Sequence, residues 1–195
     1  MSTQSPQNHL LEALQSRRSV PSKQLGDPGP DPATLMRMLQ AAVRVPDHGK
    51  LVPFRFLKIE GQARHALGEA LAARTLQRDP QAAQAAIDKD RARFSHAPLI
   101  VTVIATLVPG HKVPEQEQLL SAGCVCFALL QSAQALGFGA QWLTGWAAYD
   151  EAIGKILGLQ AQEKVAGFIH IGTPRLEVPE RERPDAAALL SDWHA

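Results

Sequence analysis

The chain has 195 residues, of which 45% are hydrophobic and 20% are charged. This is the composition of a globular protein and it excludes a disordered chain. A formal net charge of +1 gives no argument for a nucleic-acid partner. A chain of this length buries about 70% of its unfolded surface, so it needs no disulfide or metal to fold. We expect one domain over residues 1–195, with a tail at 173–195 that either frays or wraps onto a partner subunit.

Location is indicated by the N-terminus and by the cysteines. No long apolar run follows basic residues at the N-terminus, so no signal peptide is visible. The only cysteines, Cys124 and Cys126, are two positions apart in a helical pattern and point away from each other. We expect two buried thiols, with no disulfide and no shared metal. This pattern favours a reducing compartment and a cytoplasmic location.

Hydrophobic periodicity and turn residues predict the elements in chain order. They are a helix at 7–17, a loop at 20–32, a helix at 32–44, a loop at 45–49, a strand at 54–59, helices at 63–74 and 81–94, a strand at 99–106, a loop at 107–114, a helix at 116–136, a strand at 140–144, a helix at 150–157 and a strand at 165–171. Strands and helices alternate without regular βαβ repeats. We therefore expect an α+β fold in which a mixed central β-sheet is layered with helices.

Some of these elements carry a specific signal. Leu10, Leu11 and Leu14 share one face of the first helix, and Asp31-Pro32 reads as an N-cap followed by proline at the first helical position. Residues 119–149 form the longest uncharged stretch. Its apolar part, 119–130, is too short to cross about 30 Å of hydrocarbon. We expect this stretch to be buried inside the protein or at a subunit interface.

Two basic segments could bind an anion. Arg17-Arg18-Ser19 ends the first helix, and two guanidiniums with a hydroxyl can clamp a phosphate. The same arginines could simply offset the dipole at the helix C-terminus. Arg44 and Pro46-Asp47-His48 place an arginine and a histidine in one proline turn, where histidine could donate to a phosphate or a ring carbonyl. An ordinary polar loop capped by Asp47 explains that segment equally well.

A third segment, 137–145, is rich in glycine. Its glycines could let the backbone approach a flat ligand, or could form a tight turn between a helix and a strand. Gly137-Phe138-Gly139 lacks a third glycine and follows a helix, so it is not a dinucleotide fingerprint. Phosphate-loop, nucleophile-elbow and His-x-x-x-His zinc motifs are also absent from the sequence.

Taken together and in order, the motifs form a set that extends from about residue 10 to 175. They are Arg17-Arg18-Ser19, Val45-Pro46-Asp47-His48, Ala97-Pro98, His111-Lys112-Val113-Pro114, Ser121-Ala122-Gly123-Cys124, Gly137-Phe138-Gly139 with Trp142, and Gly167-Phe168 with Gly172-Thr173-Pro174. This set resembles the nitroreductase family, and within it the short YdjA-like branch. The resemblance implies a nitroreductase-like fold and a homodimer with one FMN in each of two interface sites. It also implies an oxidoreductase that passes electrons from NAD(P)H through flavin N5 to a small acceptor such as a nitroaromatic or a quinone.

The resemblance also implies which residues form the site. The implied FMN ligands are Arg17, Arg18, Ser19, Arg44, His48, Trp142, Leu143 and Thr144. The stretch implied to lie near the nicotinamide nucleotide is Ser132, Ala133, Gln134, Ala135, Leu136 and Gly137. We expect no metal and no catalytic side chain, because the redox chemistry belongs to the cofactor. Two departures concern the ring pocket: Val52 stands where relatives often have Gln or Asn, and Leu143 stands where close relatives have Arg.

Two other functions remain open on the sequence. One is a flavin-binding protein or carrier that does not turn over NAD(P)H. The other is a non-flavin fold with a hydrolytic or metal site centred on Asp47 and His48. The acceptor and the preference for NADH or NADPH are not encoded in any motif of the chain.

Overall fold

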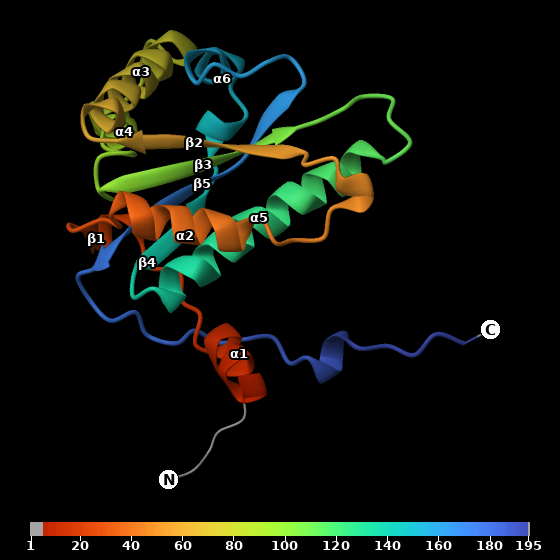
Figure 1. Ribbon diagram of the computed structural model, residues 1–195. Coiled ribbons are helices and arrows are strands. Elements are labelled where there is room, and N and C mark those ends of the chain that lie inside the picture. Colours follow the sequence, from red (N-terminus) through yellow and green to blue (C-terminus); the bar gives the residue numbers. More distant parts are fainter. Residues whose placement is uncertain (1–5, 195) are drawn as a thin grey trace.

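The computed structural model describes residues 6–194 (Figure 1). Its helices are α1 (Pro6–Gln15), α2 (Pro32–Ala42), α3 (Gln62–Arg78), α4 (Gln84–Arg91), α5 (Glu115–Ala135) and α6 (Glu151–Ile156), and its strands are β1 (Leu25–Gly26), β2 (Phe54–Glu60), β3 (Leu99–Thr106), β4 (Gly139–Leu143) and β5 (Glu163–Pro174). Short 3-10 turns are η1 (Ser22–Gln24), η2 (His48–Lys50), η3 (Trp146–Ala148) and η4 (Ala187–Leu189). Each expected helix and strand is confirmed within a few residues.

Strand β5 organises the sheet. It pairs with β3 along one edge, with Leu99 opposite Ile171, and with β4, where Gly139 lies opposite Gly172. Strand β2 extends the sheet beyond β3. Every pairing among the described strands is antiparallel. The expected α+β class is therefore confirmed, while the sheet of one chain is antiparallel where a mixed sheet was expected. The helices that connect successive strands place each strand next to a strand of opposite direction.

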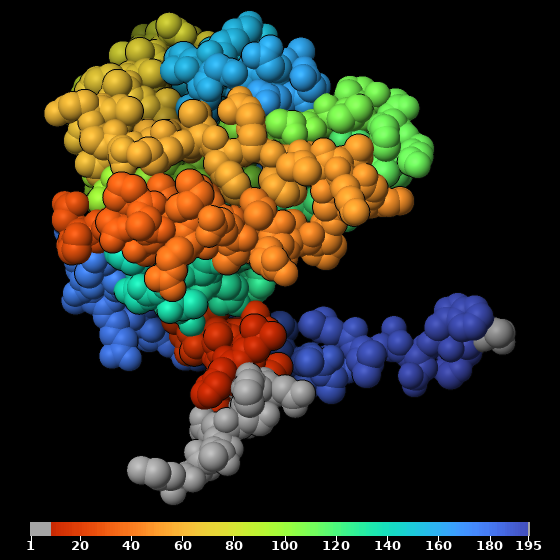
Figure 2. All heavy atoms as spheres, viewed as in Figure 1, coloured from red at the N-terminus to blue at the C-terminus, as the bar shows by residue number. Residues whose placement is uncertain are grey.

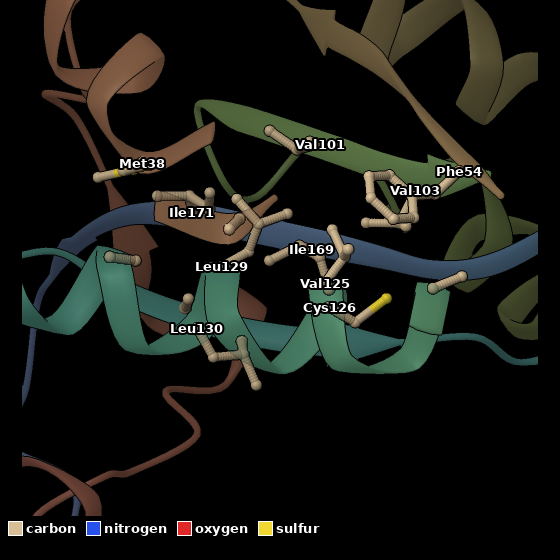
Figure 3. Close-up of a cluster of buried hydrophobic side chains, with 14 of the residues drawn as sticks. Met38, Phe54, Val101, Val103, Val125, Cys126, Leu129, Leu130, Ile169 and Ile171 are labelled. Carbon is tan, nitrogen blue, oxygen red and sulfur yellow. The ribbon is translucent and has the colours of Figure 1, made fainter. Parts of the chain in front are cut away.

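Helices cover both faces of the sheet, and each face has its own core (Figure 1). Helices α2 and α5 pack on one face, where Met38 and Leu129 are fully buried against Ile169 and Ile171 (Figure 3). Helices α3, α4 and α6 cover the opposite face, whose core includes Phe168. The N-cap that the sequence predicts for α2 is present, because the Asp31 carboxylate accepts a hydrogen bond from the Thr34 N–H at 2.7 Å.

The sequence did not predict β1, because residues 20–32 are dominated by proline and glycine. Leu25 and Gly26 pair with Pro174 and Thr173 at the end of β5. The preceding segment is also held, because the Val20 N–H donates to the Ala140 carbonyl at 3.0 Å. The chain after α1 is thus laid against the beginning of β4.

Helix α5 is only half buried. By length and composition it could cross a membrane. In its most apolar stretch of 18 residues, however, 44% is buried inside the protein. Its outward face carries Leu120 and Phe127, which are 61% and 42% exposed. Cys126 is buried, but Cys124 lies on this outward face and is exposed. The expectation of two buried thiols is therefore wrong for Cys124, because thiols two positions apart cannot share the buried face of one helix.

A fully buried histidine predicts sensitivity to mild acid. The His170 ring in β5 stacks on Phe94 with centroids 5.7 Å apart, and neither ring nitrogen has a hydrogen-bond partner among the described residues. Burial, with the charges of His96 and Arg93, lowers the pKa of His170 from 6.5 to about 4. Between these values the unfolded chain binds a proton that the folded chain does not. The free energy of unfolding therefore falls as the pH decreases from 6.5 toward 4.

Urea unfolding at pH 7 and pH 5 measures this effect. We expect the His170 contribution to cost about 2 kcal/mol of unfolding free energy at the lower pH. A His170→Phe variant keeps a flat ring over Phe94 but cannot take up a proton, so it should lose less stability over the same interval. Equal losses in the two proteins would contradict the assignment.

Candidate functional site

A group of cations lies where α1 ends. The Arg17 guanidinium donates to the Ser19 hydroxyl at 3.1 Å, and the Arg18 guanidinium donates to the carbonyls of Gln15 and Arg17. The segment is fixed to the last turn of α5, because Gln134 accepts a hydrogen bond from the Arg18 N–H at 3.3 Å. The structure therefore brings together the three residues that the sequence selected as a phosphate clamp.

The C-terminal tail adds charges to this group that the sequence reasoning missed. Glu180 forms ion pairs with Arg18 and with Arg183, the latter at 2.9 Å. Arg183 also donates to the Arg17 carbonyl at 3.3 Å. Figure 2 shows the tail continuing past α1 and away from the body of the chain. The tail contains the alternating charges Glu180, Arg181, Glu182 and Arg183, but no pattern in it indicates which segment it contacts.

Positive charge in this cluster exceeds negative charge. Burial lowers the pKa of Arg17, and the neighbouring cations Arg183, Arg181 and Arg18 lower it further, against the opposing effect of Glu180. Glu180 pairs with the guanidiniums of Arg18 and Arg183, and among the described residues no carboxylate forms an ion pair with Arg17. A dianionic phosphate would relieve this repulsion and accept the bidentate hydrogen bonds that guanidinium offers. The donor set at Arg17, Arg18 and Ser19 therefore fits the phosphate of a mononucleotide.

The second basic segment is attached to the other end of α5. His48 Nδ1 lies 2.7 Å from the Glu117 carboxylate, and the Ser121 hydroxyl donates to the Pro46 carbonyl at 2.8 Å. Asp47 does not face His48, because its two oxygens accept hydrogen bonds from the N–H groups of Leu51 and Val52. Asp47 and His48 therefore do not form a hydrolytic pair, although Asp47 does fold the loop, as its capping role predicts.

The loop is held in an unusual backbone conformation. Val52, which is 58% exposed, has a φ of +50°, and Lys50 has a φ of +56°. A β-branched residue in the left-handed region is a genuine outlier. The Asp47 carboxylate supplies the hydrogen bonds that enforce it. Position 52, where the resemblance leads us to expect Gln or Asn, is thus one where the backbone favours Asn or Gly over a β-branched residue.

The two basic segments cannot meet within one chain. Arg18 is attached at Gln134 and His48 at Glu117, which are near opposite ends of the 21-residue helix α5. The 17 residues from Glu117 to Gln134 span about 25 Å of helix. This is longer than one mononucleotide, so the structure does not place Arg44 and His48 beside Arg17 in the same chain.

Strand β4 leads from the phosphate clamp to the third segment. The Ser22 N–H donates to the Gln141 side chain at 2.6 Å, and Val20 is bonded to Ala140. Strands rise about 3.3 Å per residue, so Thr144 lies roughly 13 Å beyond Ala140. This distance exceeds a five-carbon ribityl chain alone and is comparable to the distance from the phosphate of FMN to the middle of its ring system. The segment from Ser19 along β4 to Thr144 is thus long enough to accommodate an FMN.

The side chains of β4 alternate between the two faces of the sheet. Trp142 points toward α5: its indole N–H donates to the Ala166 carbonyl at 3.1 Å, and its ring covers Gly167, where a Cβ would lie 2.2 Å from the indole nitrogen. Leu143, opposite Phe168, points to the other face. Their side chains therefore cannot both contact one flat ring from the same side. The backbone of Trp142 and Leu143, by contrast, forms part of both faces of the sheet.

The glycine-rich turn before β4 serves packing. Gly137 has a φ of +82°, and a Cβ on Gly139 would lie within 2.9 Å of Val20, Leu25 and Pro174. Gly137 thus makes the turn between α5 and β4, and Gly139 leaves room for the side chains that pack against it.

The stretch implied to lie near the nicotinamide nucleotide is at the C-terminal end of α5. Its polar side chains are already hydrogen-bonded within the chain: Ser132 donates to the Ala128 carbonyl, and Gln134 donates to Ala13 and Ser16. Ala133 is fully buried, whereas Gly137 is exposed. The stretch lies beside Arg18, so its surface adjoins the phosphate clamp. Across residues 6–194, no group of three or more His, Cys, Asp or Glu side chains could hold a metal ion.

Backbone strain at Val52 gives a testable consequence. Val52→Gly should raise the free energy of unfolding by about 0.5–1.5 kcal/mol, because glycine adopts a positive φ without a steric penalty. Val108→Gly is the matched control, since Val108 is also an exposed valine but its φ is not positive. That variant should lose stability. If both substitutions destabilise the protein equally in urea, the strain does not exist in solution.

Comparisons with known proteins agree with this architecture. Residues 14–173 match the model of the nitroreductase family. YdjA of Escherichia coli K12, which is named as an NAD(P)H nitroreductase, is 37% identical over 167 residues, covering 86% of this chain and 89% of YdjA. A nitroreductase-like protein from Bacillus cereus has the same fold, with a TM-score of 0.81, 19% identity and full coverage of both chains. A nitroreductase from Desulfovibrio desulfuricans, solved in complex with FMN, has a TM-score of 0.74 and 22% identity over 97% of this chain and 98% of its own. The chain belongs to the nitroreductase family.

Proposed function

We propose that the protein is an FMN-dependent oxidoreductase that takes electrons from NAD(P)H and passes them to a small acceptor such as a nitroaromatic or a quinone. The observation that carries the proposal is the cationic clamp at Arg17, Arg18 and Ser19, which adjoins the start of β4, roughly 13 Å from Thr144 along the strand. Family membership and the nitroreductase names of its relatives support the same chemistry.

A second subunit completes the site in this proposal. If two copies pack their exposed α5 faces together antiparallel about a two-fold axis, the Glu117 end of one helix meets the Gln134 end of the other. Arg44 and His48 of the partner subunit would then reach the phosphate clamp at Arg17. The arrangement explains why one chain holds the two groups at opposite ends of α5.

Exposed apolar side chains on three separate elements support this dimer. Nine of the exposed large hydrophobic residues lie on these elements: Leu10, Leu11 and Leu14 on α1, Leu119, Leu120 and Phe127 on α5, and Leu189, Leu190 and Trp193 on the tail. Surface of this extent is unusual on a monomer and typical of a subunit interface. The tail, which passes the C-terminal end of α5, would continue onto the partner (Figures 1 and 2).

The protein's own contribution is binding and orientation. Bound FMN would supply the redox chemistry, accepting a hydride equivalent from NAD(P)H at N5 and returning two electrons to the acceptor. Arg17, Arg18 and Ser19 would hold the phosphate, while the backbone at Leu143 and Thr144 and the indole of Trp142 would border the ring. The surface at 132–137 would adjoin the nicotinamide nucleotide. No side chain needs to transfer a proton in this scheme.

The free thiols of Cys124 and Cys126 suit a reducing compartment, and the proposed location is the cytoplasm.

The identity of the cofactor tests the clamp. Heat-released cofactor should be FMN, and Arg17→Ala should weaken FMN binding by about 1.5–3 kcal/mol, the range for hydrogen bonds to a charged group. Arg37→Ala removes an exposed arginine on α2 and should leave the affinity unchanged. Release of FAD, or no binding of any flavin, would refute the proposal. Binding of FMN without NAD(P)H oxidation would instead indicate a flavin carrier.

The dimer has its own test. Light scattering should give about twice 21.1 kDa at micromolar concentration. Phe127→Asp places a charge on the exposed face of α5 and should yield monomers with little FMN. Leu76→Asp is the control, because Leu76 is exposed to a similar degree, 44% against 42%, but lies on α3 across the sheet. A wild-type monomer that carries a full complement of FMN would rule out the shared site.

A further inference from the structure

A buried carboxylate fixes the turn that follows β4. Asp90 is 7% exposed and accepts hydrogen bonds from the Thr75 hydroxyl at 2.8 Å and from the Trp146 indole N–H, which lies 3.2 Å from each oxygen. The guanidinium of Arg78 lies over the same indole, 4.6 Å from its centroid. Helices α3 and α4 thus hold Trp146, the first residue of η3, from two sides.

The same carboxylate holds a cation against the backbone of Gly145. Arg93 donates to Asp90 Oδ1 at 2.7 Å and 3.2 Å. Its Nη1 lies 2.7 Å from the position that a Cβ on Gly145 would occupy, and Gly145 has a φ of +64°. The guanidinium therefore touches this glycine, and any side chain at position 145 would displace it.

The pair stays ionised at neutral pH. Burial opposes ionisation of Asp90, but hydrogen bonds from Arg93, Thr75 and Trp146 outweigh it and lower the pKa of Asp90 below its ordinary value. The cation thus faces Gly145, and the anion lies behind it among α3, α4 and η3. The positive charge of Arg93 therefore lies nearer to Gly145 than the negative charge of Asp90 does.

Gly145 directly follows the segment that borders the ring in the proposed function. Residues 142–144 are Trp, Leu and Thr, so β4 itself offers no charge there, and position 143 is the one where the family resemblance leads us to expect arginine. We propose that Arg93 supplies the positive charge beside the flavin ring through its contact with Gly145, and that Asp90 is the positioning residue that holds Arg93 and offsets part of its charge. The inference rests on the proposed function, and it assigns the electrostatic tuning of that site.

The midpoint potential of bound FMN is the direct readout. Reduced flavin carries negative charge at N1, so a nearby cation stabilises the reduced form and raises the potential. Arg93→Gln removes the cation, leaves Asp90 unbalanced, and should lower the potential. Asp90→Asn leaves the cation unbalanced and should raise it. The double variant should return toward the wild-type value, a cancellation that loss of structure alone does not produce.

Arg91→Gln is the matched control. Arg91 is two residues away and loses the same charge, but it pairs with Glu69 and Asp88 at the surface. The midpoint potential of FMN bound to the Arg91→Gln variant should stay at the wild-type value. If Arg93→Gln shifts the potential no further than Arg91→Gln while FMN remains bound, the inference is overturned.

Folding defects do not obscure the result. Arg93→Lys keeps a charge at the position and should hold the potential near that of the wild type, so it serves if the glutamine variant does not fold. A Lys variant with a strongly lowered potential, or an Asp90→Asn variant with an unchanged one, would also count against the inference. Failure of the wild-type protein to bind FMN is seen before any variant is made and would refute the proposed function itself.

Discussion

The length of α5 constrains everything else in this protein. The helix has 21 residues, and each of its ends is hydrogen-bonded to a different basic segment, Arg18 at Gln134 and His48 at Glu117. Because the helix is rigid and the two attachment points are 17 residues apart, they stay about 25 Å apart within a chain. A site that uses both groups must therefore be built from two chains. The exposed face of α5 is then explained as a consequence of the same geometry.

Electrostatics divides the proposed site into two parts. At the phosphate end, guanidiniums outnumber carboxylates, and the tail contributes to both through Glu180 and Arg183. At the ring end, one cation, Arg93, is held by a buried carboxylate that limits its effect. The first arrangement favours binding of a dianion, whereas the second adjusts the charge beside a ring whose own charge changes on reduction. Strand β4 fixes the distance between them.

Local patterns were sufficient for most of the fold. Periodicity found the helices and the four longer strands, and Asp31-Pro32 fixed the start of α2. A two-residue strand such as β1 has no periodicity to detect, and proline-rich sequence conceals it. The antiparallel sheet also escaped prediction, because the spacing of strands along a chain does not say in which direction neighbours run.

The site was predictable only in part. Arg17, Arg18 and Ser19 are adjacent in sequence, so their proximity follows from local structure, and Arg17 donates to Ser19. Their separation from His48 depends on where each segment contacts α5, which is a tertiary fact. The tail charges and the contact between Arg93 and Gly145 join residues far apart in the chain. No pattern in a single sequence indicates such contacts. The glycine at position 145 is the one residue type that agrees with the contact, because its φ is positive and Arg93 occupies the space of a Cβ.

Subunit complementation tests the shared site most directly. One variant carries Arg17→Ala, and the other carries Arg44→Ala with His48→Ala; each homodimer should bind FMN weakly. After the two are unfolded together, refolded and allowed to pair at random, about one quarter of all sites should regain wild-type affinity, since each mixed dimer has one intact site. This recovery is the result that a site built from two chains predicts. If mixing restores no FMN binding although mixed dimers form, the site is not shared.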